Sequence, residues 1–293
     1  MKLLEICIDL ELFYWKAPHL AEQNLEYVPR TLSALHLYET ELDLESLRLL
    51  ARENGSIFRS LRLSNITGEQ LNVILGLSPL RHLSVDSIVE LEDLSALAEI
   101  RRLSQLQVLR FWLEDKGDGQ PVNQLDEVMI AIMRACNDMR KLHVENAVLS
   151  DRAVSLVSVY WKRLQSFKLY SSTFPATYNQ TLPVRNSHIT DLALTELLKL
   201  DHLHTLAIPN GSLSQRLLDR LIDRPQFCYL VLREHCSFVD KLFQRMLDKS
   251  ERASYNAYKL KIGDHSALLR LAAICRPANF VFKPAEVYNF DLY

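Results

Sequence analysis

Few residues of this 293-residue chain have the types and spacing that chemistry requires. His235 and Cys236 resemble the start of a phosphatase loop, but that loop needs an arginine at the position of Leu242. His202 and His204 could ligate a metal ion together, yet no Cys, Asp or Glu stands at ligand spacing beside them. We therefore expect ordinary surface histidines here, with no metal site and no cofactor.

Other enzyme motifs are also missing from the sequence. Asp118, in a Gly-Asp-Gly segment, lacks the alternating oxygen ligands of a calcium loop. The chain has 7 glycines and no glycine-rich phosphate loop, nucleophile elbow or dinucleotide fingerprint. The sequence therefore predicts a protein without enzymatic activity.

Composition narrows the class of protein further. Apolar residues make up 48% of the chain, and 34 Lys and Arg balance 36 Asp and Glu, which excludes an intrinsically disordered chain and a polybasic nucleic-acid tail. No apolar run approaches the length of a membrane span, and acidic residues interrupt the apolar N-terminal segment, so we expect no secretory signal. Five cysteines without CxxC spacing fit a reducing compartment. These features favour an intracellular protein, cytoplasmic or nuclear.

A repeated L-x-x-L-x-L frame organises the chain. Its apolar positions are Leu32/Leu35/Leu37, Phe58/Leu61/Leu63, Leu80/Leu83/Val85, Leu106/Leu109/Phe111, Met139/Leu142/Val144, Leu164/Phe167/Leu169, Leu203/Leu206/Ile208, Phe227/Leu230/Leu232 and Ala257/Leu260/Ile262, with a weaker opening copy at Leu3/Ile6/Ile8. Between frames the apolar period becomes helical, over residues 44–51, 71–75, 128–136, 154–161 and 217–222. Each unit is thus a strand, a turn and a helix, and stacked units bury a shared core.

The segments FRSLRLSNITGEQL and MRKLHVENAVLSDRAV resemble the leucine-rich repeat family, in its ribonuclease-inhibitor and F-box types. The resemblance implies an α/β solenoid: a horseshoe with a parallel concave sheet, convex helices and about nine or ten irregular repeats. We expect one domain over residues 1–293, with a degenerate first repeat or cap at 1–31, repeats at 32–277 and a C-terminal cap or aromatic tail at 278–293.

The chain departs from the family in two ways. The usual Asn or Cys after the strand is replaced, for instance by Ala147, and no F-box is recognisable before the first repeat.

The x positions of the frame should face the concave side, because side chains alternate along a strand. Nine of these 27 positions are Lys or Arg, four are His and none is acidic. Average composition would give about three of each sign, and strand propensity does not explain the excess. The sequence therefore predicts a basic concave surface that attracts an oppositely charged partner.

The candidate partner-binding residues gather in the middle of the predicted arc. They are Arg59, Arg62, Arg81, Arg110, Trp112, Arg140, Lys141, His143, Lys168 and Tyr170. Two insertions, at 114–124 and 172–188, should project from one rim on either side of the fifth repeat. Repeat proteins often place binding loops there, although such insertions can also be without function.

Several functions remain open on this pattern. The first is a non-catalytic scaffold that binds an acidic or phosphorylated protein partner. The family resemblance adds a substrate-recognition or adaptor role in a ubiquitin ligase or another complex. The alternatives are a structural subunit that uses the convex face and C-terminal tail, an RNA- or phosphoinositide-binding module, or a basic strand surface that serves only solubility. The overall acidity disfavours nucleic acid.

Overall fold

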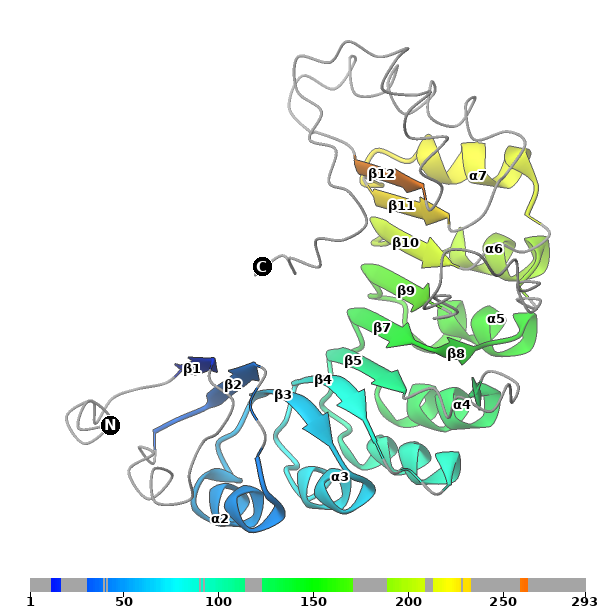
Figure 1. Ribbon diagram of the computed structural model, residues 1–293. Coiled ribbons are helices and arrows are strands. Elements are labelled where there is room, and N and C mark those ends of the chain that lie inside the picture. The colour runs from blue at the N-terminus through cyan, green and yellow to red at the C-terminus, as the bar shows by residue number, and fades with distance from the viewer. Residues whose placement is uncertain are drawn as a thin grey trace, which may run out of the picture.

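The computed structural model describes residues 12–16, 31–38, 40, 42–89, 91, 93–113, 123–170, 189–208, 213–227, 229–232 and 259–262. At 13–16, 123–124, 170, 229–232 and 259–262 the description covers the backbone alone. Within these residues the strands form one ten-stranded parallel sheet and a separate two-stranded sheet. The described helices lie on one side of the large sheet (Figure 1). The predicted α/β layering is confirmed.

The strands follow the leucine frames. They are β1 Leu12–Lys16, β2 Ala34–Tyr38, β3 Ser60–Ile66, β4 His82–Ile88, β5 Val108–Leu113, β7 Lys141–Glu145, β9 Ser166–Tyr170, β10 Thr205–Ile208, β11 Tyr229–Leu232 and β12 Lys259–Ile262. From β2 onward, each strand begins two residues after the first apolar position of its frame. Their order across the sheet is their order in the chain. Strand β1 was not predicted and pairs with β2, while the predicted opening copy at 3–8 lies outside the described residues.

Helices connect successive strands, as parallel pairing requires. The α-helices are α2 Leu44–Asn54, α3 Gly68–Ile74, α4 Asp126–Ala135, α5 Asp151–Tyr160, α6 Asp191–Leu197 and α7 Gln215–Ile222, and a 3-10 helix, η2, spans Leu94–Arg102. The helical periods in the sequence correctly located α2, α3, α4, α5 and α7. They missed η2 and α6.

The helix N-termini are connected from one unit to the next by aspartates. The first residue of α4, Asp126, accepts a hydrogen bond from the backbone N–H of Ser150 at 2.8 Å. Asp151 accepts from the N–H of Thr190 and Asp191 from that of Ser214, each at 2.6 Å. Each carboxylate therefore fixes the N-cap residue of the following helix, so that neighbouring units share a defined spacing.

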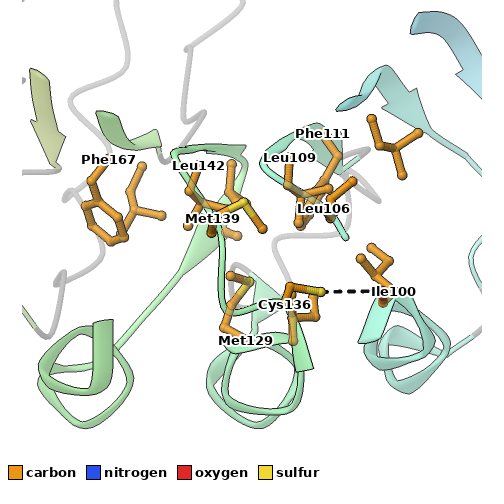
Figure 2. Packing of buried hydrophobic residues seen from close by; sticks show 14 of the residues in the cluster. Ile100, Leu106, Leu109, Phe111, Met129, Cys136, Met139, Leu142 and Phe167 are labelled. Atoms are coloured by element: carbon orange, nitrogen blue, oxygen red, sulfur yellow. Dashed lines mark hydrogen bonds between the residues drawn. The ribbon is translucent and has the colours of Figure 1, made fainter. Parts of the chain in front are cut away.

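The core lies between the sheet and the helices. Figure 2 shows Leu109, Phe111, Leu142 and Phe167 of the strands above Met129 and Cys136 of the α4 region. The apolar positions of the described frames are almost fully buried, and each such side chain contributes about 1.5–3 kcal/mol by leaving water. Trp161 is completely buried and its Nε1 donates to the carbonyl of Cys136 at 2.8 Å.

Cys136 is a structural residue of this core. Its Sγ lies 3.3 Å from the carbonyl oxygen of Leu103 and 3.9 Å from that of Ile100, the contact drawn in Figure 2. Burial raises the pKa of the thiol to about 12, so the nucleophilic thiolate is scarcely populated near neutral pH.

One asparagine performs a role that the sequence had not assigned. Asn146, just after β7, is buried, and its Nδ2 donates to the carbonyl of Leu113 at 2.8 Å. It has a φ of 58°, in the left-handed region that asparagine tolerates better than most residues. The amide stands one residue before Ala147, which occupies the position of the family's usual asparagine, and links two units there.

The described helices are short; the longest, α2, has 11 residues. A span of the hydrocarbon core needs about 20 apolar residues. In the described part of the chain, no helix combines the length and apolar character of a membrane span.

Candidate functional site

The x positions of the frame lie on the face of the large sheet opposite the helices, here called the open face. Along β2, β3, β4, β5 and β7, buried leucine-type residues alternate with partly or fully exposed x positions. The parallel register aligns these x positions into rows. One row, by successive pairing, is Arg62, Ser84, Arg110, His143, Lys168 and Ala207. Adjacent members are about 4.8 Å apart, so basic positions of separate units lie in common rows, which Ser84 interrupts in this case.

Four side chains of the open face form what we call the arginine network: Tyr38, Arg62, Asp86 and Arg110. The Arg62 guanidinium lies over the Tyr38 ring, 4.0 Å from its centroid, and donates to the Tyr38 hydroxyl at 2.8 Å. Arg62 also donates to Asp86 Oδ1 at 3.3 Å, and Arg110 Nη2 lies 3.6 Å from the same oxygen. The two arginine side chains are only 13% and 15% exposed.

Asp86 therefore neutralises charge that the sequence had counted as basic. Burial lowers the pKa of Arg110, and the Asp86 carboxylate opposes that effect by favouring the charged guanidinium. A guanidinium remains charged at neutral pH under such a shift. The network thus holds two largely buried cations that share one carboxylate, so part of their charge is neutralised within the fold.

A second pairing lies on β7. His143 Nε2 and Glu145 Oε1 are 2.9 Å apart, and both side chains are less than one-fifth exposed. Burial lowers the pKa of His143; the Glu145 carboxylate raises it, and Arg110 and Lys168 add to the lowering. In the register, Glu145 pairs with Trp112 on one side and Tyr170 on the other. The predicted aromatics are therefore brought beside an acidic residue.

A different set of cations gathers toward the strand entrances, which we call the lysine patch: Arg81, His82, Arg140, Lys141, Lys168 and His204. The lowered pKa values of the two histidines reflect how near the other cations lie. Burial lowers the pKa of His82, and Lys141, Arg140 and Arg81 lower it further. Burial also lowers the pKa of His204, with added contributions from Lys141 and Lys168. Lys141 is thus close enough to act on both histidines, although they lie on opposite sides of it.

The edge of the patch contains one acidic residue that the sequence had not identified. Asp138 lies 3.9 Å from Arg140 and 3.1 Å from Arg163, and it accepts from Gln107 at 3.0 Å. It stands directly before the first frame position, Met139. This position, in the turn before β7, was the hint that the sequence offered. The repeat pattern does not say which turn residues lie on the open face, so Asp138 was not predicted there.

The predicted binding residues are only partly brought together. Arg62 and Arg110 belong to the arginine network, and Arg81, Arg140, Lys141 and Lys168 to the lysine patch. Arg59 is exposed beside the start of β3. Trp112 and His143 lie next to Glu145, and the backbone of Tyr170 lies beside them while its side chain is outside the described residues.

The open face is not equally accessible along its length. On β10 the x positions Thr205 and Ala207 are buried, at 8% and 0% exposure, contrary to the expectation of a uniformly exposed concave surface. The insertions fall almost wholly outside the described residues, apart from Asn123 and Gln124, which form β6 and pair with β8, Ala147–Val148.

The motifs considered for metal or nucleophilic chemistry find little support. Among the described residues, no group of three or more His, Cys, Asp or Glu side chains is arranged to hold a metal ion. His204 Nδ1 lies 3.0 Å from Thr205 Oγ1, and His202 is exposed before β10. His235 and Cys236 lie outside the described residues.

Comparison with known proteins yields similar folds only. No family model and no curated protein matches the sequence. The structure resembles that of the yeast Rad7 and Elc1 complex, with 14% identity, 84% of this chain and 76% of that chain covered, and a TM-score of 0.48. It resembles the Caenorhabditis elegans tropomodulin C-terminal domain at 11% identity, with 73% of this chain and 98% of that chain covered and a TM-score of 0.35. It resembles internalin C2 of Listeria monocytogenes at 16% identity, with 88% of this chain and 83% of that chain covered and a TM-score of 0.35. Similarity at this level does not extend to function, which must be argued from the residues of this chain.

Proposed function

We propose that this chain is a non-catalytic scaffold of leucine-rich repeats that binds a protein partner on its open face. The observation that supports it best is the lysine patch, where the parallel register aligns cations from separate units on one solvent-accessible sheet surface. Clustered charge of one sign raises the local concentration of an oppositely charged partner and speeds its capture.

The same proposal includes the domain organisation of the chain and the role of the scaffold in a larger complex. The ten-stranded order supports a single horseshoe-shaped domain of about nine or ten repeats. The cysteine pattern supports a place inside the cell. A substrate-recognition or adaptor role in a ubiquitin ligase, which the F-box likeness implies, is one setting for such a scaffold. The identity of the bound partner would test that role directly.

The test is affinity capture from the source cell, followed by mass spectrometry. The experimental bait reverses three cations of the patch, the exposed Arg81 and Arg140 and the half-buried Lys168, as Arg81→Glu/Arg140→Glu/Lys168→Glu. Arg110 is left intact, because a glutamate there would face Asp86 in the arginine network and disturb folding. The matched bait, Arg102→Glu/Arg134→Glu/Arg216→Glu, has the same charge change at exposed positions on η2, α4 and α7.

We expect one partner to be lost from the patch variant and retained by the wild-type and helix-side baits. Circular dichroism and thermal unfolding should show that all three baits are folded. If both variants retain every partner, the open face is not the binding surface and the proposal fails. Loss from both variants would point to net charge in place of a defined site, and would equally count against it.

A further inference from the structure

The open face contains cations of two kinds, and the difference indicates which of them meet a partner. In the arginine network, Asp86 lies between Arg62 and Arg110, so their charges are partly compensated within the fold. In the lysine patch, backbone hydrogen bonds join Arg81, Gln107, Arg140, Gln165 and His204 in order across the sheet, which places cations of separate strands in one row. An incoming anion therefore meets several cations side by side at the patch, whereas at the network it would compete with Asp86.

The dimensions of the patch favour an extended anion over a compact one. Its members extend from β4 through β5, β7 and β9 to the start of β10, which are five adjacent strands. Four intervals of about 4.8 Å span roughly 19 Å. A single phosphate group contacts only a small part of that distance. An extended peptide, at about 3.3 Å per residue, crosses it with roughly six residues.

The surroundings of the patch disfavour a long polyanion. Asp138 lies at one edge of the patch, and Glu145 stands on β7 beyond His143. These acids bound the positive region, and the chain as a whole has a net charge of −2. A short acidic segment fits within such limits, whereas a nucleic acid would continue into surfaces of its own sign.

We infer that the partner binds through an extended acidic segment of about six residues, whose Asp or Glu side chains contact Lys141 and Lys168 across β7 and β9. This inference rests on the proposed function and specifies its ligand. Lys141 is the centre of the site because β7 is the middle one of the five strands, and in register His82 stands two strands away on one side and Thr205, next to His204, two strands away on the other. Lys168, two residues further along the neighbouring strand in register, provides the second contact.

The test is a zero-length cross-linking experiment on the captured complex. A water-soluble carbodiimide joins a lysine amine to a carboxylate in direct contact, with loss of water, and leaves no spacer. Mass spectrometry of the digested complex should show isopeptide bonds from Lys141 and Lys168 to Asp or Glu residues within one short segment of the partner. Lys162 and Lys199, which are exposed away from β7 and β9, serve as reference lysines in the same digest.

Two results would overturn the inference. One is a complex that depends on the patch but is cross-linked to the partner only through other lysines. The other is release of the partner by a protein phosphatase or by nuclease, which would identify phosphate or nucleic acid as the recognised group. The proposed function survives the first result and release by the phosphatase, because the open face still binds a protein partner. Release by nuclease, a capture insensitive to patch reversal, or equal loss from both variants would count against the proposed function as well.

A binding measurement then gives the contribution of Lys141 and Lys168 to the affinity for the segment. A fluorescent peptide copied from the cross-linked segment is titrated with wild-type protein and with Lys141→Gln/Lys168→Gln, and anisotropy is recorded. We expect the double variant to bind at least about tenfold more weakly, as loss of two close charge contacts at an interface implies. The variant Arg134→Gln/Arg216→Gln has the same charge change on the helical side and should bind like wild type. Equal affinity for both variants would refute the role of the two lysines.

Discussion

The arginine network and the lysine patch lie on the same sheet face but differ in the chemistry around each cation. In the network, Arg62 and Arg110 are largely buried, stacked or paired with Tyr38 and Asp86. In the patch, cations lie near one another and lower the pKa of the two histidines among them. We propose from this comparison that the same residue types serve stability in one region and binding in the other.

The physical reason is the placement of acidic residues. A buried or half-buried charge must be paired, because desolvation without compensation is costly. Asp86 meets that need in the network. Arg81 and Arg140 of the patch are exposed, so water weakens the repulsion between their charges and pairing within the fold matters less there. Substitutions in the two regions should therefore affect different measurements.

The largest expected effect comes from breaking the network. Replacing Asp86 with Ala leaves Arg62 and Arg110 half-buried without their shared carboxylate, and should lower the free energy of unfolding by about 1–3 kcal/mol. Urea denaturation followed by circular dichroism measures the change. Glu99→Ala, which breaks an exposed pair with Arg101, should change stability by less than about 0.5 kcal/mol. Equal effects of the two substitutions would show that the network contributes no more than a surface ion pair.

A smaller effect should appear in the pH dependence of stability. Burial is the leading cause that lowers the pKa of His36, His82, His143 and His204 below the ordinary value of 6.5. Between 6.5 and the lowered values, the unfolded chain binds more protons than the folded one, so stability falls as pH falls. Carboxylates titrate at lower pH and leave this window to the histidines.

The urea midpoint measured from pH 8 to pH 5.5 tests this expectation. It should be nearly constant above pH 7 and decline below 6.5. The variant His82→Gln should show a shallower decline, because one of the four groups no longer titrates. A midpoint that rises as the solution is acidified would contradict the assigned direction of the shifts.

The smallest expected effect is a local change in the pKa values of two histidines in the lysine patch. Lys141 lowers the pKa of both His82 and His204, so Lys141→Gln should raise both values toward 6.5. Imidazole chemical shifts recorded by NMR across a pH titration report each histidine separately. Arg134→Gln on α4 removes the same charge from the helical side and should leave both titrations in place. If only one histidine responds to Lys141→Gln, Lys141 is not the centre of the patch.

Much of the architecture follows from the pattern of apolar residues along the chain. The L-x-x-L-x-L frame located the strands from β2 to β12, because alternation along a strand commits one face to the core. Long apolar stripes located α2 and α4, whereas the short stripe of α6 and the 3-10 geometry of η2 gave no comparable period. Thr67 and Ser150 are the N-cap residues of α3 and α5, the first as a full capping box with Gln70.

The site was predicted less completely. The sequence placed the cations on one face correctly, since side-chain alternation decides the face. It counted Arg62 and Arg110 as binding residues, although the structure pairs both with Asp86. It expected exposed x positions on β10, where Thr205 and Ala207 are buried. It did not predict that His82 and His204 would join the cations of β7.

By itself, the sequence determined that this chain forms repeated strand–helix units with apolar residues inside and cations outside. These features depend on local periodicity, which neighbouring residues in the chain specify. Only the tertiary structure decided which charges are neutralised and which gather. Arg62 and Asp86 are 24 residues apart, and His82 and Lys141 are 59, so their encounters depend on strand register and side-chain reach. Coulomb interactions and desolvation act over distances in space, and the folded sheet sets those distances.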